Sequence, residues 1–341
     1  MVKLGVVLSL RNHPDYPYSL ADLYSDYIED GVRADSLGFD HLWINEHHFS
    51  PDNLCPSTMV TLAAIASRTK RIRLGTGVVN VPFHDPLRLA EDAAVLDIIS
   101  RGRVDLGIGI GSSLVEYRTF NTRREEAWRR TWEAADFIER VMKNERVDFA
   151  GEYYRYEDVW QNTRPVQPSL PIWWGGFGRN SMKRAAERSY HVLAAASDVY
   201  DETLINLGKS IDDHEVAQIT AVHVAETREQ AWDEAQYGAH WYMNFHRTRN
   251  NWPAGYTSSG PLETLPAPER LRNVDGLLFM PGMPIYIGTP DFVREELLAD
   301  IKGRGGRISQ LALHFRLPGM RTPEVERSME LFRAEIMPHL Q

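Results

Sequence analysis

Short apolar runs alternate with amphipathic helical patterns about eight times along this 341-residue chain. We expect strands at residues 4–10, 41–45, 72–79, 104–110, 171–174, 191–196, 219–225 and 311–315. We expect helices at residues 19–37, 57–69, 86–99, 124–143, from 181 onward, 228–242, 290–302 and 324–337. Repeated strand–helix units fold into a closed (β/α)8 barrel or an open doubly wound sheet. Eight units in one chain favour the TIM barrel, which we expect residues 1–341 to form as a single domain.

Two stretches interrupt this alternation. Residues 145–169 predict an irregular insertion that contains a short hairpin. Residues 244–283 are polar and rich in Pro and Gly, and so long a segment without secondary structure is uncommon unless it is functional. We interpret them as a mobile lid over the barrel mouth, with a solvated surface insertion as the alternative.

Composition and charge narrow the classes of function. The net charge of −9 argues against nucleic acid as a partner. A single cysteine, Cys55, excludes an intrachain disulfide framework and a multi-cysteine metal site. The first residues show no signal-peptide pattern, and no apolar run approaches the roughly 20 residues of a membrane span. We therefore expect a cytoplasmic protein with no membrane partner.

The polar motif Glu46-His47-His48-Phe49 directly follows the second expected strand. In a barrel, functional groups lie at the carboxyl ends of the strands, and imidazoles there can hold and move protons near neutral pH. Side chains alternate along a strand, so Glu46 and His48 would share one face and His47 the other. The three therefore do not predict a metal site, and an ordinary polar strand end is the alternative.

Glycine-rich segments follow the next strands. Residues 75–82 and 107–113 leave room for a flat ring, although tight packing at a barrel corner explains the latter about equally well. Residues 175–181 lie between a strand and a helix N-terminus, which suits an anion, with a plain glycine turn as the alternative. Arginines at 123, 124, 129 and 130 could bind a phosphate or form a solvated charged face.

Several of these segments together resemble the bacterial luciferase-like flavin-dependent monooxygenases. The resemblance spans nearly the whole chain and is most specific in the first hundred residues. The matching positions are Gly38-Phe39-Asp40, Trp43, Glu46-His47-His48-Phe49, Leu74-Gly75-Thr76, Pro86, Arg88-Leu89-Ala90-Glu91-Asp92, Leu96-Asp97, Ser100, Gly102-Arg103, Gly107-Ile108-Gly109, Gly111, Gly288-Thr289-Pro290 and Phe332 to Leu340.

The resemblance implies a barrel that binds reduced FMN at its mouth and uses O2 to oxygenate a small organic substrate. It also implies a separate flavin reductase, and a homodimer that packs helices near the second and third strands. By the family pattern, His47 is catalytic and a non-proline cis peptide is expected at Gly77–Val78. The cofactor-binding positions it implies are Gly77, Val78, Asn80, Gly109, Ile110, Gly111, Phe177, Gly178, Ser181 and one of Arg129 or Arg130.

Departures from luciferase itself keep other functions open. The arginine, cysteine and tryptophan that luciferase places near Ile110, Gly109 and Ala196 are absent here. Their absence favours a general monooxygenase over a light-emitting enzyme. An F420-dependent oxidoreductase on the same barrel is the alternative. A flavin-binding protein without turnover and a metal-dependent hydrolase are the other classes. The hydrolase is disfavoured because the motif offers no i, i+2 pair of histidines.

Overall fold

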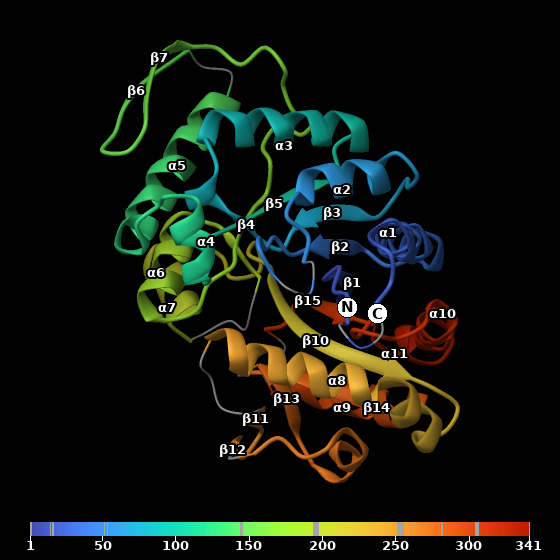
Figure 1. Ribbon diagram of the computed structural model, residues 1–341. Helices are drawn as coiled ribbons and strands as arrows, with labels where there is room; N and C mark the ends of the chain where they lie inside the picture. Colours follow the sequence, from blue (N-terminus) through green and yellow to red (C-terminus); the bar gives the residue numbers. More distant parts are fainter. Residues whose placement is uncertain are drawn as a thin grey trace.

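A computed structural model describes residues 2–13, 15, 17–50, 52, 54–143, 146–193, 198–250, 256–262, 264–280, 282–303 and 307–340. Eight parallel strands close into a ring (Figure 1). In ring order they are β1 (Lys3–Leu8), β2 (His41–Ile44), β3 (Arg73–Thr76), β5 (Val104–Gly109), β8 (Ile172–Trp174), β9 (His191–Leu193), β10 (Val216–Val224) and β15 (Gln310–His314). The predicted TIM barrel is confirmed.

Helices surround the ring (Figure 1). They are α1 (Leu20–Leu37), α2 (Thr58–Ala66), α3 (Pro86–Ser100), α4 (Leu114–Thr119), α5 (Ala127–Met142), α6 (Arg179–Glu187), α7 (Asp198–Asn206), α8 (Arg228–Asn250), α9 (Pro290–Gly303), α10 (Thr322–Leu331) and α11 (Met337–Leu340). The 3-10 segments η1 (Val81–Phe83), η2 (Arg124–Glu126) and η3 (Pro268–Asn273) and the π-helical segment η4 (Phe332–Ile336) adjoin them. The sequence did not predict α4 or α7. Among the described residues, every helix is too short or too polar to span a membrane.

Large and small side chains interlock inside the ring. Trp43 and Trp173 are both 1% exposed, and their ring centroids lie 5.0 Å apart at an edge-to-face angle of 70°. Gly75 makes room for the first indole, because a Cβ there would lie 2.2 Å from Trp43 Cε3. Each indole N–H is satisfied: Trp43 donates to Gln310 at 2.8 Å and Trp173 to Asp105 at 3.3 Å. This packing fills the interior, so ligands must bind at the ends of the barrel.

The insertion at 145–169 contains the expected hairpin, formed by β6 (Val147–Ala150) and β7 (Arg155–Val159). A two-residue strand, β4 (Val79–Asn80), pairs with the end of β5.

The interpretation of residues 244–283 as a structureless lid is wrong for the described part of that segment. Helix α8 continues to Asn250, and β11 (Tyr256–Thr257), β12 (Gly260–Pro261), η3 and β13 (Leu277–Met280) follow; residues 251–255, 263 and 281 lie outside the described residues. Strand β13 pairs with β14 (Met283–Gly288). Strand β14 in turn pairs in parallel with the C-terminal half of β10, residues 221–224. Buried Leu271 and Phe279 anchor the segment, which lies beside α8 and β14 in Figure 1. Apolar anchors and strand pairing make it a folded flank of the barrel.

Candidate active site

An open cavity of about 810 Å³ lies at the carboxyl ends of β2, β3, β5 and β8. Its volume is in the range of cofactor and ligand sites. Most of the predicted positions line it: His47, Gly77, Val78, Asn80, Ile110, Gly111, Phe177, Gly178 and Ser181. The other lining residues are Asn45, Glu46, Ser112, Arg124, Trp128, Trp174, Gly175, Gly176, Arg179 and Asn180.

His47 enters the cavity just beyond the end of β2. Its backbone N–H donates to the carbonyl of Cys55 at 3.0 Å. Its Nδ1 atom lies 3.3 Å from Oε1 of Glu116, a fully buried carboxyl group on α4. The same Oε1 accepts the backbone N–H of His48 at 2.8 Å. Glu116 therefore holds both the ring of His47 and the chain behind it, while 24% of the His47 side chain stays exposed.

Glu46 and His48 share the other side of the chain, as alternation predicted. Nε2 of His48 lies 3.2 Å from Glu46 Oε1, and Nε2 of His84, which follows η1, lies 2.9 Å from the same oxygen. Asn80 adds its backbone N–H to Oε1 at 3.2 Å and its side-chain amide to the Glu46 carbonyl at 3.0 Å. Burial alone would raise the pKa of Glu46, but the hydrogen bonds from the two imidazoles outweigh it and lower the pKa to about 2. Burial would lower the pKa of His84, but Glu46 raises it instead.

Val78 forms the wall between β3 and β5. The peptide bond Gly77–Val78 is cis, which confirms the expectation. Gly109 does not line the cavity. A Cβ on Gly109 would lie 2.6 Å from Val78 Cγ2, and one on Gly175 would lie 2.3 Å from Val78 Cγ1. These two glycines therefore allow the strands to close around Val78, which also lines the cavity.

A glycine turn that joins β8 to α6 also lines the cavity. Gly178 is the N-cap of α6 with φ 96°, and no heavy atom would lie within 4 Å of a Cβ there. Ser181, in the first turn of α6, accepts a hydrogen bond from the indole N–H of Trp174 at 2.5 Å. A helix N-terminus has N–H groups without intrahelical partners and the positive end of the helix dipole, so the start of α6, which lines the cavity, suits an anion such as a phosphate.

The structure does not bring Arg129 or Arg130, the two positions implied by the family pattern, to the cavity. Arg129 pairs with Glu152 at 2.7 Å, and Arg130 lies 3.6 Å from Glu126; neither lines the cavity. Arg124 lines it instead, donates to the carbonyl of Gly111 at 2.9 Å and lies over the ring of Tyr117. The difference has a local cause. Residues 124–126 form the separate turn η2, which places Arg124 at the cavity, whereas Arg129 and Arg130 belong to α5.

Sequence reasoning missed Glu116 and His84. Glu116 lies 69 residues from His47, and His84 lies 38 residues from Glu46. No local pattern links positions so far apart. Arg124 did have a signal, since it belonged to the arginine group that the sequence singled out, but Trp128 had none beyond its helical position.

Comparisons with known proteins identify the family of the chain and proteins with a similar fold. The chain matches the family model described as luciferase-like monooxygenase over residues 2–307. It is similar to limonene 1,2-monooxygenase of Rhodococcus erythropolis, with 28% identity over 90% of this chain and 79% of that protein. It is also similar to F420-dependent glucose-6-phosphate dehydrogenase of Kineococcus radiotolerans, with 36% identity over 60% of each chain. The FMN complex of the oxygenating constituent of 3,6-diketocamphane monooxygenase from Pseudomonas putida has a similar fold, with a TM-score of 0.80 at 22% identity and 99% of each chain covered.

Proposed function

Because the chain belongs to the luciferase-like monooxygenases, a family of oxidoreductases, we propose that it is a reduced-FMN-dependent monooxygenase acting on a small organic substrate. One observation carries the proposal: a single cavity joins the wall around Val78, an anion-binding turn and the side chain of His47. A flat, phosphate-bearing cofactor matches that combination.

The residues present fit FMN at both of its ends. Gly77, Val78, Asn80, Ile110 and Gly111 would hold the ring, because together they form the wall of the cavity next to His47. The start of α6, with Phe177, Gly178 and Ser181, would hold the phosphate together with Arg124. Bound reduced FMN would supply two electrons and the centre at which O2 is activated.

His47 would transfer the proton that the reaction requires. Its side chain reaches the cavity, and Glu116 fixes the orientation of the ring through Nδ1. We place the proton exchange at the other ring nitrogen, Nε2, on the side of the reacting molecule. Glu116 acts through His47 and is a positioning residue.

The alternative is an F420-dependent oxidoreductase that transfers hydride without O2. The F420-dependent relative supports it, since the phosphate end of the cavity would fit either cofactor. The deciding experiment titrates the protein with reduced FMN and with F420 and follows turnover of a substrate panel. We expect substrate-dependent O2 consumption with reduced FMN. Anaerobic turnover with F420, together with no oxygenation with FMN, would reject the monooxygenase.

A separate reductase would supply the reduced FMN. The name of the 3,6-diketocamphane enzyme, which calls its chain the oxygenating constituent, supports a division of this kind. Purified protein should therefore oxygenate substrate only when a flavin reductase and NAD(P)H are added. Unaided reduction of FMN by NAD(P)H would contradict this part of the proposal.

Replacing Arg124 with alanine is expected to weaken FMN binding by roughly 10-fold or more, the effect of losing a charge-assisted hydrogen bond to phosphate. Arg129→Ala is the matched control, because Arg129 pairs with Glu152 outside the cavity. Its dissociation constant for FMN should stay within about twofold of wild type. Both values can be measured by flavin fluorescence titration. The assignment fails if Arg129→Ala weakens binding and Arg124→Ala does not.

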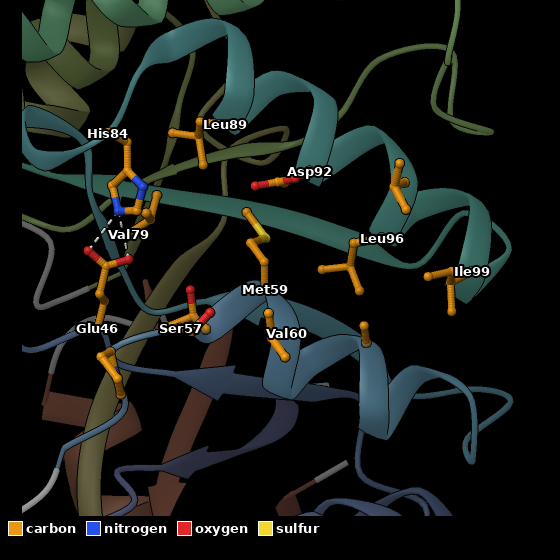
Figure 2. Close-up of a pocket in the computed structure, with 14 residues that line it drawn as sticks. Glu46, Ser57, Met59, Val60, Val79, His84, Leu89, Asp92, Leu96 and Ile99 are labelled. Carbon is orange, nitrogen blue, oxygen red and sulfur yellow. Dashed lines mark hydrogen bonds and ion pairs between the residues drawn. The ribbon is translucent and has the colours of Figure 1, made fainter.

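We propose that the protein forms a homodimer through α2 and α3. Figure 2 shows these helices on either side of an apolar groove of about 240 Å³. Val60 is 70% exposed and Ile99 is 43% exposed on this face, where water contact is unfavourable. The double variant Val60→Glu/Ile99→Glu should be monomeric in light scattering after size exclusion. The control Ile205→Glu changes an apolar residue on α7 that is 61% exposed, and this variant should remain dimeric. A monomeric wild type would refute the proposal.

A further inference from the structure

We propose that Glu46, His48 and His84 form a binding site for one divalent transition-metal ion, of the Zn²⁺ or Co²⁺ type. The three side chains come from two chain segments, one after β2 and one after η1. Their ligand atoms all lie within 4.8 Å of one another. The site lies apart from the proton-transfer side of the motif, because His47 turns toward Glu116 instead.

The distances between the ligand atoms match metal coordination. Zinc lies about 2.0–2.2 Å from imidazole nitrogen and carboxylate oxygen, so neighbouring ligands of a tetrahedral ion are about 3.3 Å apart. Here Glu46 Oε1 lies 3.2 Å from Nε2 of His48 and 2.9 Å from Nε2 of His84. A small outward movement of the two rings would therefore place an ion between the three groups.

The two imidazoles can bind an ion without a net change in their number of protons. An ionised carboxylate has no proton to donate, so both imidazoles now donate their Nε2–H to Glu46. A metal ion would bind to the deprotonated Nε2 atoms and to the carboxylate, and would replace the two hydrogen bonds. In each neutral imidazole the proton would move from Nε2 to Nδ1 through solvent, so binding of the ion would release no net proton.

The surroundings hold the ligands in place. The Glu46 carboxylate also accepts the backbone N–H of Asn80, and its side chain is 1% exposed. The ring of His48 packs edge-on against Phe120 at a centroid distance of 4.8 Å. Such partners orient metal ligands before the ion arrives.

The site also has room for a water ligand on the His84 side. The side chain of His84 is 31% exposed and lies at one end of the groove between α2 and α3 (Figure 2). Asp92 faces the same groove, and its negative charge acts on His84 and would attract a cation. Two imidazoles favour Zn²⁺, Co²⁺ or Ni²⁺ over Mg²⁺ and Ca²⁺, which prefer oxygen ligands. The bound ion would tie the end of β2 to the segment after η1.

Cobalt titration of the untagged, chelator-stripped protein tests the proposal without any flavin. We expect visible Co²⁺ absorption that saturates at one ion per chain and is lost on addition of Zn²⁺. Because no flavin is present, failure of this experiment would leave the proposed monooxygenase function untouched.

Variants distinguish this site from adventitious binding. His84→Ala and Glu46→Gln should each weaken Co²⁺ binding at least about 10-fold. His84→Cys keeps a ligand, should retain binding, and guards against a folding defect in the alanine variant. The control His339→Ala removes an exposed histidine elsewhere and should bind as wild type. Binding that does not saturate, or that His84→Ala leaves unchanged, would overturn the proposal.

Discussion

Replacing His47 with glutamine is expected to lower the turnover of substrate oxygenation by about 10²–10⁴-fold, the usual contribution of a positioned acid–base group. Glutamine keeps the polarity and approximate size of the side chain but cannot exchange a proton near neutral pH. The dissociation constant for FMN should stay within a few-fold of wild type, because in the proposed arrangement the start of α6 and Arg124, not His47, hold the phosphate. Steady-state oxygenation and flavin titration measure the two quantities separately.

Two further variants sharpen this prediction. Glu116→Gln keeps a hydrogen-bond acceptor beside Nδ1 but removes the charge, so we expect a smaller loss of kcat, of about 10–100-fold, with unchanged FMN affinity. His339→Gln changes an exposed histidine far from the motif and should leave turnover unaltered. If the His47→Gln enzyme oxygenates substrate at the wild-type rate when reduced FMN is supplied, His47 is not the proton-transfer residue.

The free energy of unfolding is expected to fall by about 3 kcal/mol for each pH unit between pH 6 and pH 5. The cause is three buried or half-buried histidines that stay neutral in the folded chain. Burial lowers the pKa of His314 to about 3 and that of His191 to about 4, and it lowers the pKa of His41 well below 6.5. Nearby cations add to this effect: Arg11 at His314, and Lys3 and Arg73 at the other two.

The free energy of unfolding falls as the pH falls because the folded and unfolded chains bind different numbers of protons. In the unfolded chain these histidines titrate near 6.5, so between pH 6.5 and about 4 the unfolded state binds more protons than the folded state. Stability is therefore present above pH 6.5 and is lost as the pH falls. Asp30 and Asp105 oppose the trend at lower pH, since burial raises the pKa of both carboxyl groups.

Denaturant unfolding at several pH values between 5 and 7.5 measures the slope. His314→Gln should reduce the slope by about 1 kcal/mol per pH unit, because it removes one of the groups held neutral, whereas His339→Gln should not change it. A free energy of unfolding that stays constant from pH 7 to pH 5 would show that the three histidines are not held neutral.

Much of the fold could be predicted because it follows from local patterns. Ser19 caps α1 by accepting the backbone N–H of Asp22 at 3.1 Å, and Gly38 ends that helix with φ 94°, as their residue types indicate. The ends of strands are harder to predict from the sequence: β10 begins at Val216 rather than at residue 219. Burial on both sides of a strand blurs its ends, because no change of polarity marks them.

The segment at 244–283 shows what composition could not reveal. Its Pro, Gly and polar residues indicate a loop. In the structure, however, β13 forms an antiparallel pair with β14, and Leu271 is fully buried. Short strands have little intrinsic preference of their own, so pairing with a neighbour decides whether they form.

The sequence by itself determined the barrel, the strand ends at which polar and glycine-rich segments gather, and the likeness of the Glu-His-His-Phe motif to a known family. Only the tertiary structure decided that Glu116 orients His47, that His84 joins Glu46 and His48, and that Arg124 rather than Arg129 or Arg130 lines the cavity. The reason is physical. Periodicity and capping act over a few residues and can be read along the chain, whereas these contacts join positions tens of residues apart that meet only when parallel strands close into a ring.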